Sequence, residues 1–201
     1  MKSTLDEMRQ FVFSKKFKNK EKIMKTITYL MLTRENFRIE SLDNFKRYQK
    51  IQECWRKINN MLVLVPYEFI EDWNLSKRRK VAEAILKVID CKNIVYGAYF
   101  KDEVVGFIYL SDKFFGRDNQ YIELSMFQVS ELFRKMGIGK SLFKFACEDA
   151  RHLGVSKLYI SAHSSKESQA AYRKIGCIEA VEINKAIAED EPFDIQMEYQ
   201  L

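Results

Sequence analysis

One stretch of the sequence combines glycines and basic residues in a spacing that could bind phosphate groups: RKMGIGKS, residues 134–141. Gly137 and Gly139 lack a Cβ atom, so the backbone around them can turn successive N–H groups toward one anion. A helix is expected to begin here and would add the positive end of its dipole. Formal positive charge comes from three side chains: Arg134, Lys135 and Lys140. The stretch predicts a pyrophosphate-binding loop that needs no metal ion, with an ordinary glycine-containing turn as the alternative.

Two familiar nucleotide-binding motifs come close to this stretch but do not fit it. A P-loop needs a glycine five residues before Gly139, and that position is Arg134. A dinucleotide-binding turn needs a small residue three positions after Gly139, and that position is Leu142. The spacing therefore excludes both a nucleoside triphosphate loop and a dinucleotide turn.

Histidines and cysteines are too dispersed to suggest metal or nucleophile chemistry. The chain has two histidines and four cysteines, and no two cysteines form a CxxC pair. Neither a zinc-ligand spacing nor a nucleophile elbow with a histidine partner is visible. We expect no metal site, and thiols that stay reduced, as in a cytoplasmic protein.

The net charge of +6 in a chain of 201 residues is carried entirely by residues 1–34. The remaining basic and acidic residues balance, which does not indicate a nucleic-acid-binding body. No apolar run approaches the roughly 18 residues that a membrane-spanning helix needs, and no secretion signal is visible at the N-terminus. These features predict a cytoplasmic protein that does not enter a membrane.

Apolar spacing and turn residues predict a chain of alternating helices and strands. Residues 4–32 have a helical pattern, as do residues 45–62 with Asp43 as the cap. A further helix is expected to begin at Asn74 or Ser76 and to end near Asp90. Other helices are predicted over 138–153 and 164–176, and strands over 37–42, 93–100, 103–110, 121–129, 157–163, 177–183 and 193–201.

This order of elements predicts a mixed α/β fold, with helices on both faces of one sheet. Residues 1–34 are expected to form a basic helical extension, and residues 35–201 one folded domain. No glycine- or serine-rich linker separates the two parts, so a second independently folding domain is not expected.

Two motifs in this arrangement resemble those of the GCN5-related N-acetyltransferase superfamily. The first is the loop Arg134-x-x-Gly137-x-Gly139 between a strand and a helix, which matches the superfamily's pyrophosphate loop. The second is AAYRKIGC, residues 170–177, in which Tyr172 and Gly176 fall on the superfamily's tyrosine and glycine. The order of elements from residue 37 onward is also similar, whereas residues 1–34 lie outside the resemblance.

The resemblance implies a mostly antiparallel sheet, acetyl-CoA as the acetyl donor, and direct transfer to an amine without a covalent enzyme intermediate. Backbone N–H groups of the strand before the loop would face the thioester carbonyl, with Phe127 and Val129 lining the pantetheine. Tyr172 occupies the position of the general acid that protonates the leaving thiolate. Glu123 is the first candidate for the general base, and His163, acting through water, is the alternative.

Two segments are expected to shape the acceptor site, VPYEFIEDWNLS at 65–76 and NKAIAEDEPFD at 184–194. They combine aromatic and acidic residues that would suit a small cationic amine with an apolar body, although a solvated acidic loop would look the same. The residues concerned are Tyr67, Phe69, Glu71, Asp72, Trp73, Glu189, Asp190 and Glu191.

Two other readings of the sequence stay open beside a small-molecule N-acetyltransferase. One is a non-catalytic module that binds acyl-CoA. The other is an acetyltransferase that docks on a protein or RNA target through the basic residues 1–34. Edge pairing of the C-terminal strand would also allow a homodimer.

Overall fold

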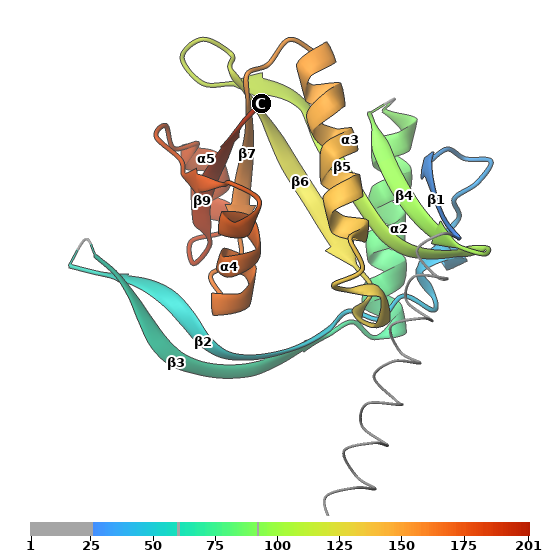
Figure 1. Cartoon of the computed structure of the whole chain (residues 1–201), viewed down its shortest axis with the longest axis horizontal. Helices are drawn as coiled ribbons and strands as arrows, with labels where there is room; N and C mark the ends of the chain where they lie inside the picture. The colour runs from blue at the N-terminus through green and yellow to red at the C-terminus, as the bar shows by residue number, and fades with distance from the viewer. Residues whose placement is uncertain (1–25, 60, 92) are drawn as a thin grey trace, which may run out of the picture.

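The computed structural model describes residues 26–59, 61–91 and 93–201. Within these residues a seven-stranded sheet has the order β1-β4-β5-β6-β7-β9-β8 (Figure 1). All neighbours are antiparallel except β6 and β7, which are parallel. The strands are β1 (Ile27–Met31), β4 (Val95–Phe100), β5 (Glu103–Phe115), β6 (Tyr121–Val129), β7 (Lys157–Ala162), β8 (Ile178–Glu179) and β9 (Ile195–Gln200). The expected mixed, mostly antiparallel sheet is confirmed.

Helices cover both faces of the sheet (Figure 1). They are α2 (Leu75–Asp90), α3 (Ile138–His152), α4 (Lys166–Lys174) and α5 (Lys185–Asp190), with short 3₁₀ helices η1 (Ile39–Leu42) and η2 (Glu131–Phe133). Neighbouring residues of a strand point to opposite faces. Ile108 of β5 accordingly packs in the core under α3, whereas Phe107 packs in the core under α2. The two cores hold α2 and α3 in place, and the turn that begins α3 is thereby held against β6.

A long hairpin, β2 (Tyr48–Ile58) and β3 (Met61–Asp72), forms a separate two-stranded sheet that extends past α4 (Figure 1). The predicted helix over 45–62 is therefore wrong. Ile51 and Cys54 are three residues apart and both fully buried, so their spacing resembles one helical face. Pairing with β3 overrides that local pattern, and Cys54 is covered because it forms an isolated backbone bridge with Ser165.

Two further expectations about the elements are corrected. The predicted strand over 37–42 is the 3₁₀ helix η1, and the end of the predicted helix over 4–32 is strand β1. The strand forms because Ile27–Met31 pairs with β4 along its whole length. Strand β9 pairs with β7 along its whole length, and among the described residues β8 pairs with it only at Met197 and Glu198, so the homodimer expected from edge pairing stays a prediction. The rest of the predicted extension, residues 1–25, lies outside the described residues.

Candidate active site

Strands β6 and β7 separate part of the way along their length. Their parallel pairing covers only Tyr121–Glu123 on β6 and Lys157–Tyr159 on β7. Leu124 and Met126 pair with adjacent residues of β5, which makes Ser125 the extra residue of a β-bulge. A bulge bends its strand, and beyond this point β6 and β7 diverge (Figure 1). From Ser125 to Val129, the backbone groups on the β7 side of β6 are therefore not paired with β7 in the register.

The peptide groups of Phe127 and Val129 point toward this divergence. The N–H of Ser130 donates to the carbonyl of Val105, at 2.9 Å, which makes Gly106 and Val129 a non-hydrogen-bonded pair of the β5–β6 ladder. Since paired and unpaired positions alternate, Phe127 is also of the non-hydrogen-bonded kind, and its N–H faces away from β5. This orientation agrees with the role predicted for both residues, which stays a prediction.

The loop after β6 has the backbone geometry of an anion cradle. Lys135 and Gly137 both have positive φ, 60° and 82°, and Gly137 is the N-cap of α3. The first hydrogen bond within the helix joins the N–H of Ser141 to the carbonyl of Gly137, at 3.1 Å. The N–H groups of residues 138–140 therefore have no acceptor within the helix. Their number and direction fit a pyrophosphate group.

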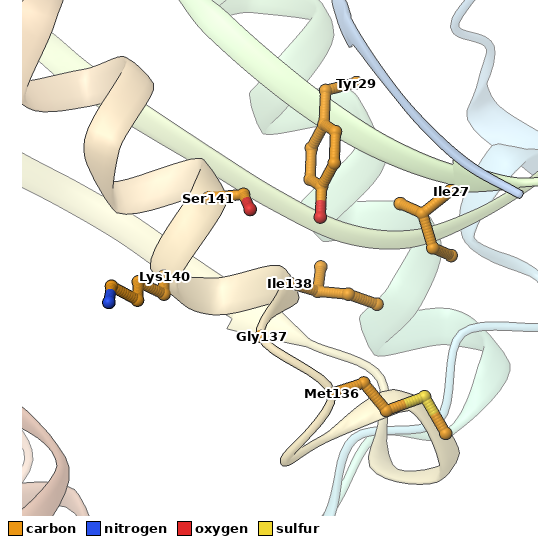
Figure 2. A pocket seen from close by; sticks show the side chains of 7 residues that line it. All are labelled: Ile27, Tyr29, Met136, Gly137, Ile138, Lys140 and Ser141. Atoms are coloured by element: carbon orange, nitrogen blue, oxygen red, sulfur yellow. The ribbon is translucent and has the colours of Figure 1, made fainter. Parts of the chain in front are cut away.

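Gly139 allows the helix to approach β6 closely. A Cβ atom at this position would lie 3.1 Å from Cζ of Phe127 and 3.7 Å from Cγ2 of Val129. The side chains of Phe127 and Val129 thus pack against the helix start, while their peptide groups line the divergence. Figure 2 shows a pocket of about 200 Å³ on the β1 side of the turn, where Tyr29 and Ser141 face one another and Lys140 extends away from them.

Arg134 is held by the protein itself. Its Nε donates to the carbonyl of Val129 at 3.1 Å, and its NH1 group donates to the carbonyl of Tyr48 at 2.9 Å. Its backbone N–H donates to the carbonyl of Glu131 at 3.2 Å. Arg134 therefore ties the loop to the hairpin, which makes it a positioning residue, whereas Lys135 and Lys140 are exposed beside the turn.

Glu123 and Tyr172 lie on either side of the divergence, on β6 and α4. Burial raises the pKa of Glu123, a hydrogen bond from Ser125 opposes this, and the charge of Glu191 raises it further. Burial also raises the pKa of Tyr172, so its phenol holds its proton at neutral pH. Glu191 acts on both groups, which places the segment before β9 next to the two predicted catalytic residues.

Asp194 belongs to the site although no sequence pattern singled it out. Burial and the charge of Glu191 raise the pKa of its carboxyl to about 6, while a hydrogen bond from the backbone N–H of Ser164 opposes the rise. The pairing of Ile195 with Ala162 places Asp194 beside the end of β7. Only the antiparallel neighbourhood of β7 and β9 reveals this, because the two strands are far apart in the sequence.

His163 is poorly placed to accept a proton. Its Nδ1 accepts a hydrogen bond from the N–H of Ser165 at 3.1 Å, and burial lowers its pKa. A neutral ring with Nδ1 as acceptor carries its proton on Nε2. His163 would then act as a donor, and its ring packs against Phe69 with centroids 5.9 Å apart.

The β2–β3 hairpin lies against the segment that joins β7 to α4. The N–H of Trp55 donates to the carbonyl of Ser164 at 2.8 Å, and NH1 of Arg56 donates to the Ser164 hydroxyl at 2.6 Å. Glu71 accepts a hydrogen bond from NH2 of Arg47 at 2.6 Å. Of the aromatic residues expected here, Trp73 is instead buried in the core under α2, where it stacks on Phe45.

The described residues contain neither a candidate metal site nor a helix that could span a membrane. Among residues 26–59, 61–91 and 93–201, no group of three or more His, Cys, Asp or Glu side chains could hold a metal ion. Over the same residues, every helix is too short or too polar to span a bilayer.

The fold and site together define a class of protein, in which an anion-binding loop at the start of a helix lies next to two diverging strands of the sheet. The family model described as "Acetyltransferase (GNAT) family" matches residues 49–177, and the chain belongs to this family. The expected family and enzyme class, an N-acetyltransferase, are thereby confirmed. No curated protein matches the chain.

Solved structures with the same fold cover nearly the whole chain. Nourseothricin acetyltransferase matches with a TM-score of 0.64 and 16% identity, over 87% of this chain and 98% of that one. A putative streptothricin acetyltransferase from Bacillus anthracis str. Ames, in complex with acetyl coenzyme A, has a TM-score of 0.61 and 16% identity, over 87% and 97%. The PaiA N-acetyltransferase from Thermoplasma acidophilum, in complex with coenzyme A, has a TM-score of 0.56 and 17% identity, over 88% and 99%. These likenesses establish the fold.

Proposed function

We propose that the protein transfers an acetyl group from acetyl-CoA directly to the amine of a small cationic acceptor. The observation that carries this proposal is the cradle of residues 135–140, with its unpaired N–H groups at the start of α3 and two residues at positive φ. It fits a pyrophosphate ester and opens next to the peptide groups of Phe127 and Val129. Two solved structures of the same fold contain acetyl-CoA or CoA.

Acetyl-CoA would supply the activated acetyl thioester, and the chain would supply orientation and proton transfer. N–H groups of residues 136–140 would bind the pyrophosphate, with Lys135 and Lys140 adding charge. The N–H groups of Phe127 and Val129 would bind the pantetheine and polarise the thioester carbonyl. These assignments use groups whose directions the backbone already fixes.

Proton transfer would involve residues on β6, α4 and the segment before β9. Glu123 would accept the proton of the acceptor ammonium, because burial raises its pKa above the ordinary range of a carboxyl. Asp194 would hold the ammonium in place as a second carboxylate. Tyr172 would donate its proton to the leaving thiolate, and burial keeps the phenol protonated until that step.

The acceptor is expected to carry positive charge at its reacting end. Four carboxylates of this region affect the pKa of one another or of a common neighbour. They are Glu71, Glu123, Glu191 and Asp194. Such a set of carboxylates favours an ammonium group over an acidic acceptor.

The first test is thermal unfolding with acetyl-CoA, with ATP–Mg²⁺ and NAD as controls. A ligand at about 100 times its dissociation constant stabilises the fold by about 2.7 kcal/mol, a rise in midpoint of roughly 5–10 °C for a domain of this size. Release of free CoA with a panel of amines then separates an enzyme from a module that only binds acyl-CoA. A shift with ATP alone, or turnover of acidic amino acids alone, would refute the proposal.

A further inference from the structure

Arg47, just before β2, carries hydrogen-bond donors that have no partner. Its side chain is 7% exposed, and NH2 donates to Oε2 of Glu71 at 2.6 Å. Its Nε and NH1 groups are buried and have no hydrogen-bond partner among the described residues. A guanidinium has five N–H donors, so three of them, one on Nε and two on NH1, are left without an acceptor.

A buried charged group with unused donors is costly, and proteins retain such groups where something binds them. An unpaired buried polar group costs free energy, more so when it is charged. Burial is the main reason that the pKa of Arg47 is lowered, but a guanidinium remains protonated in proteins. The unused donors are therefore available to an acceptor from outside the chain.

The surroundings of Arg47 place these donors on the acceptor side of the proposed active site. Its charge acts on Tyr172 of α4, on His163 at the end of β7 and on Arg134 of the cradle, in each case as a contribution smaller than burial. Its backbone is fixed by the N–H of Trp73, which donates to the Arg47 carbonyl at 3.0 Å. Arg47 thus lies near the predicted general acid, at the base of the hairpin that covers the site.

The donors that Arg47 leaves unused suit an anion. Arg47 and Arg134 both interact with Glu71, and Arg134 also interacts with Glu131. Glu71 accepts from NH2 of Arg47, which leaves the Nε and NH1 groups for a second carboxylate. A carboxylate matches a guanidinium in shape and forms strong charge-assisted hydrogen bonds with it.

We propose that Arg47 binds a carboxylate of the acceptor, so that the substrate is an amine that also carries a carboxylate, such as an amino acid. This inference rests on the proposed function. The acceptor's ammonium faces Glu123 and Asp194, and its carboxylate faces the free donors of Arg47. An amino acid with a neutral or basic side chain meets both requirements, whereas a second carboxylate would meet the acidic residues.

The test compares each amino acid with its own carboxamide, for example lysine with lysinamide, as acceptors in the CoA-release assay. The two compounds carry the same two amines and differ at the carboxylate. Because the carboxamide also lowers the pKa of the neighbouring α-ammonium, the rates are compared across pH. We expect the native protein to prefer the amino acid by about 10- to 100-fold in kcat/KM, as for a buried charge-assisted pair. Equal rates for the two compounds would refute the proposal.

The variant to test is Arg47→Gln combined with Glu71→Gln, which removes both charges so that neither is left buried alone. It should lose the preference for the carboxylate while KM for acetyl-CoA stays within about 2-fold. A preference for the carboxylate that survives in the double variant would overturn the assignment. A raised KM for acetyl-CoA would overturn it too, because Arg47 would then bind the phosphates of the cosubstrate. The matched control is Arg79→Gln, which breaks an exposed pair with Asp43 and should keep the preference.

A binding measurement separates failure of this inference from failure of the proposed function. Thermal unfolding with lysine or lysinamide needs no turnover. If no amine is acetylated, a larger midpoint shift with lysine that is absent in the double variant still supports the carboxylate site. Equal shifts with the two compounds, or shifts that persist in the double variant, would overturn it. If the double variant does not fold, Arg47→Lys takes its place, and it should retain only part of the preference because it has fewer donors.

Discussion

The cosubstrate side and the acceptor side of this site are built in different ways. Apart from Phe127 and Val129, the cradle uses a single run of chain, residues 134–141, whose glycines and basic residues are neighbours in sequence. The proposed acceptor side draws on five separate segments, with Arg47, Glu71, Glu123, Tyr172 and Asp194. The first can therefore be recognised from spacing alone, whereas the second exists only once the hairpin and β9 are in place.

The variant with the largest expected effect is Glu123→Gln, on the acceptor side. A glutamine cannot take a proton from the ammonium, so kcat should fall by about 10²- to 10⁴-fold. KM for acetyl-CoA should not change, because Glu123 lies outside the cradle. The measurement is CoA release at saturating acetyl-CoA across pH. Full activity at every pH would show that another group is the base.

Tyr172→Phe should lower kcat by about 10²-fold, since it removes the proton donor for the thiolate and keeps the ring. The phenol of Tyr96 offers a matched control, because burial also raises its pKa but it interacts with Asp149 of α3. Tyr96→Phe should leave kcat unchanged. The acid role would be lost if the two variants behaved alike in steady-state kinetics.

Asp194→Asn should raise KM for the acceptor by about 10-fold at pH 8. The pKa of Asp194 is raised to about 6, so in the native protein its charge is present above this pH and lost below it. The difference between variant and native protein should therefore shrink as the pH falls through about 6. A difference independent of pH would mean that the carboxylate charge is not what the acceptor senses.

The raised pKa of Asp194 also makes the stability of the fold depend on pH. A carboxyl whose pKa is higher in the folded than in the unfolded protein favours folding below its unfolded pKa, and this contribution is lost as the pH rises through the folded value. Asp194→Asn should thus raise the melting temperature above pH 6 relative to the native protein. Below pH 4 the two should melt alike.

On the cosubstrate side, Gly137→Ala should raise KM for acetyl-CoA by about 10-fold without lowering kcat at saturation. Gly137 has a φ of 82°, so a Cβ atom there is strained, and Gly137 is the N-cap of the helix whose first N–H groups form the cradle. Gly154→Ala is the matched control, since Gly154 at the other end of α3 has a φ of 85° and a Cβ would meet no described atom within 4 Å. Both variants should melt earlier, by an amount worth about 1–2 kcal/mol, but only the first should affect acetyl-CoA.

The contrast between the two sides also explains what the sequence could predict. Arg134, Gly137 and Gly139 belong to one turn, so their spacing predicts the cradle, and together with the motif at Tyr172 and Gly176 it predicts the family. The segment of β2 falls in the predicted helix over 45–62 because Ile51 and Cys54 have helical spacing, but long-range pairing with β3 makes it a strand. Without the hairpin, Arg47 could not be placed in the site. Asp194 was missed because its neighbour Ser164 is brought near by β7–β9 pairing.

The smallest expected effect comes from Arg134, because it joins the two sides and belongs to neither reaction step. Arg134→Gln would weaken the hydrogen bonds to the carbonyls of Val129 and Tyr48, one on the cradle side and one at the start of the hairpin. Each such bond contributes about 0.5–1.5 kcal/mol, so KM for acetyl-CoA and KM for the acceptor should both rise by a few-fold, with kcat nearly unchanged.

Arg134→Lys should restore part of this effect, since an ammonium can reach one carbonyl but lacks the planar fork needed for both. Separate titrations of the two substrates provide the measurement. A change confined to acetyl-CoA would show that Arg134 contacts the phosphates directly, because a residue that only positions the loop against the hairpin must disturb both substrates together.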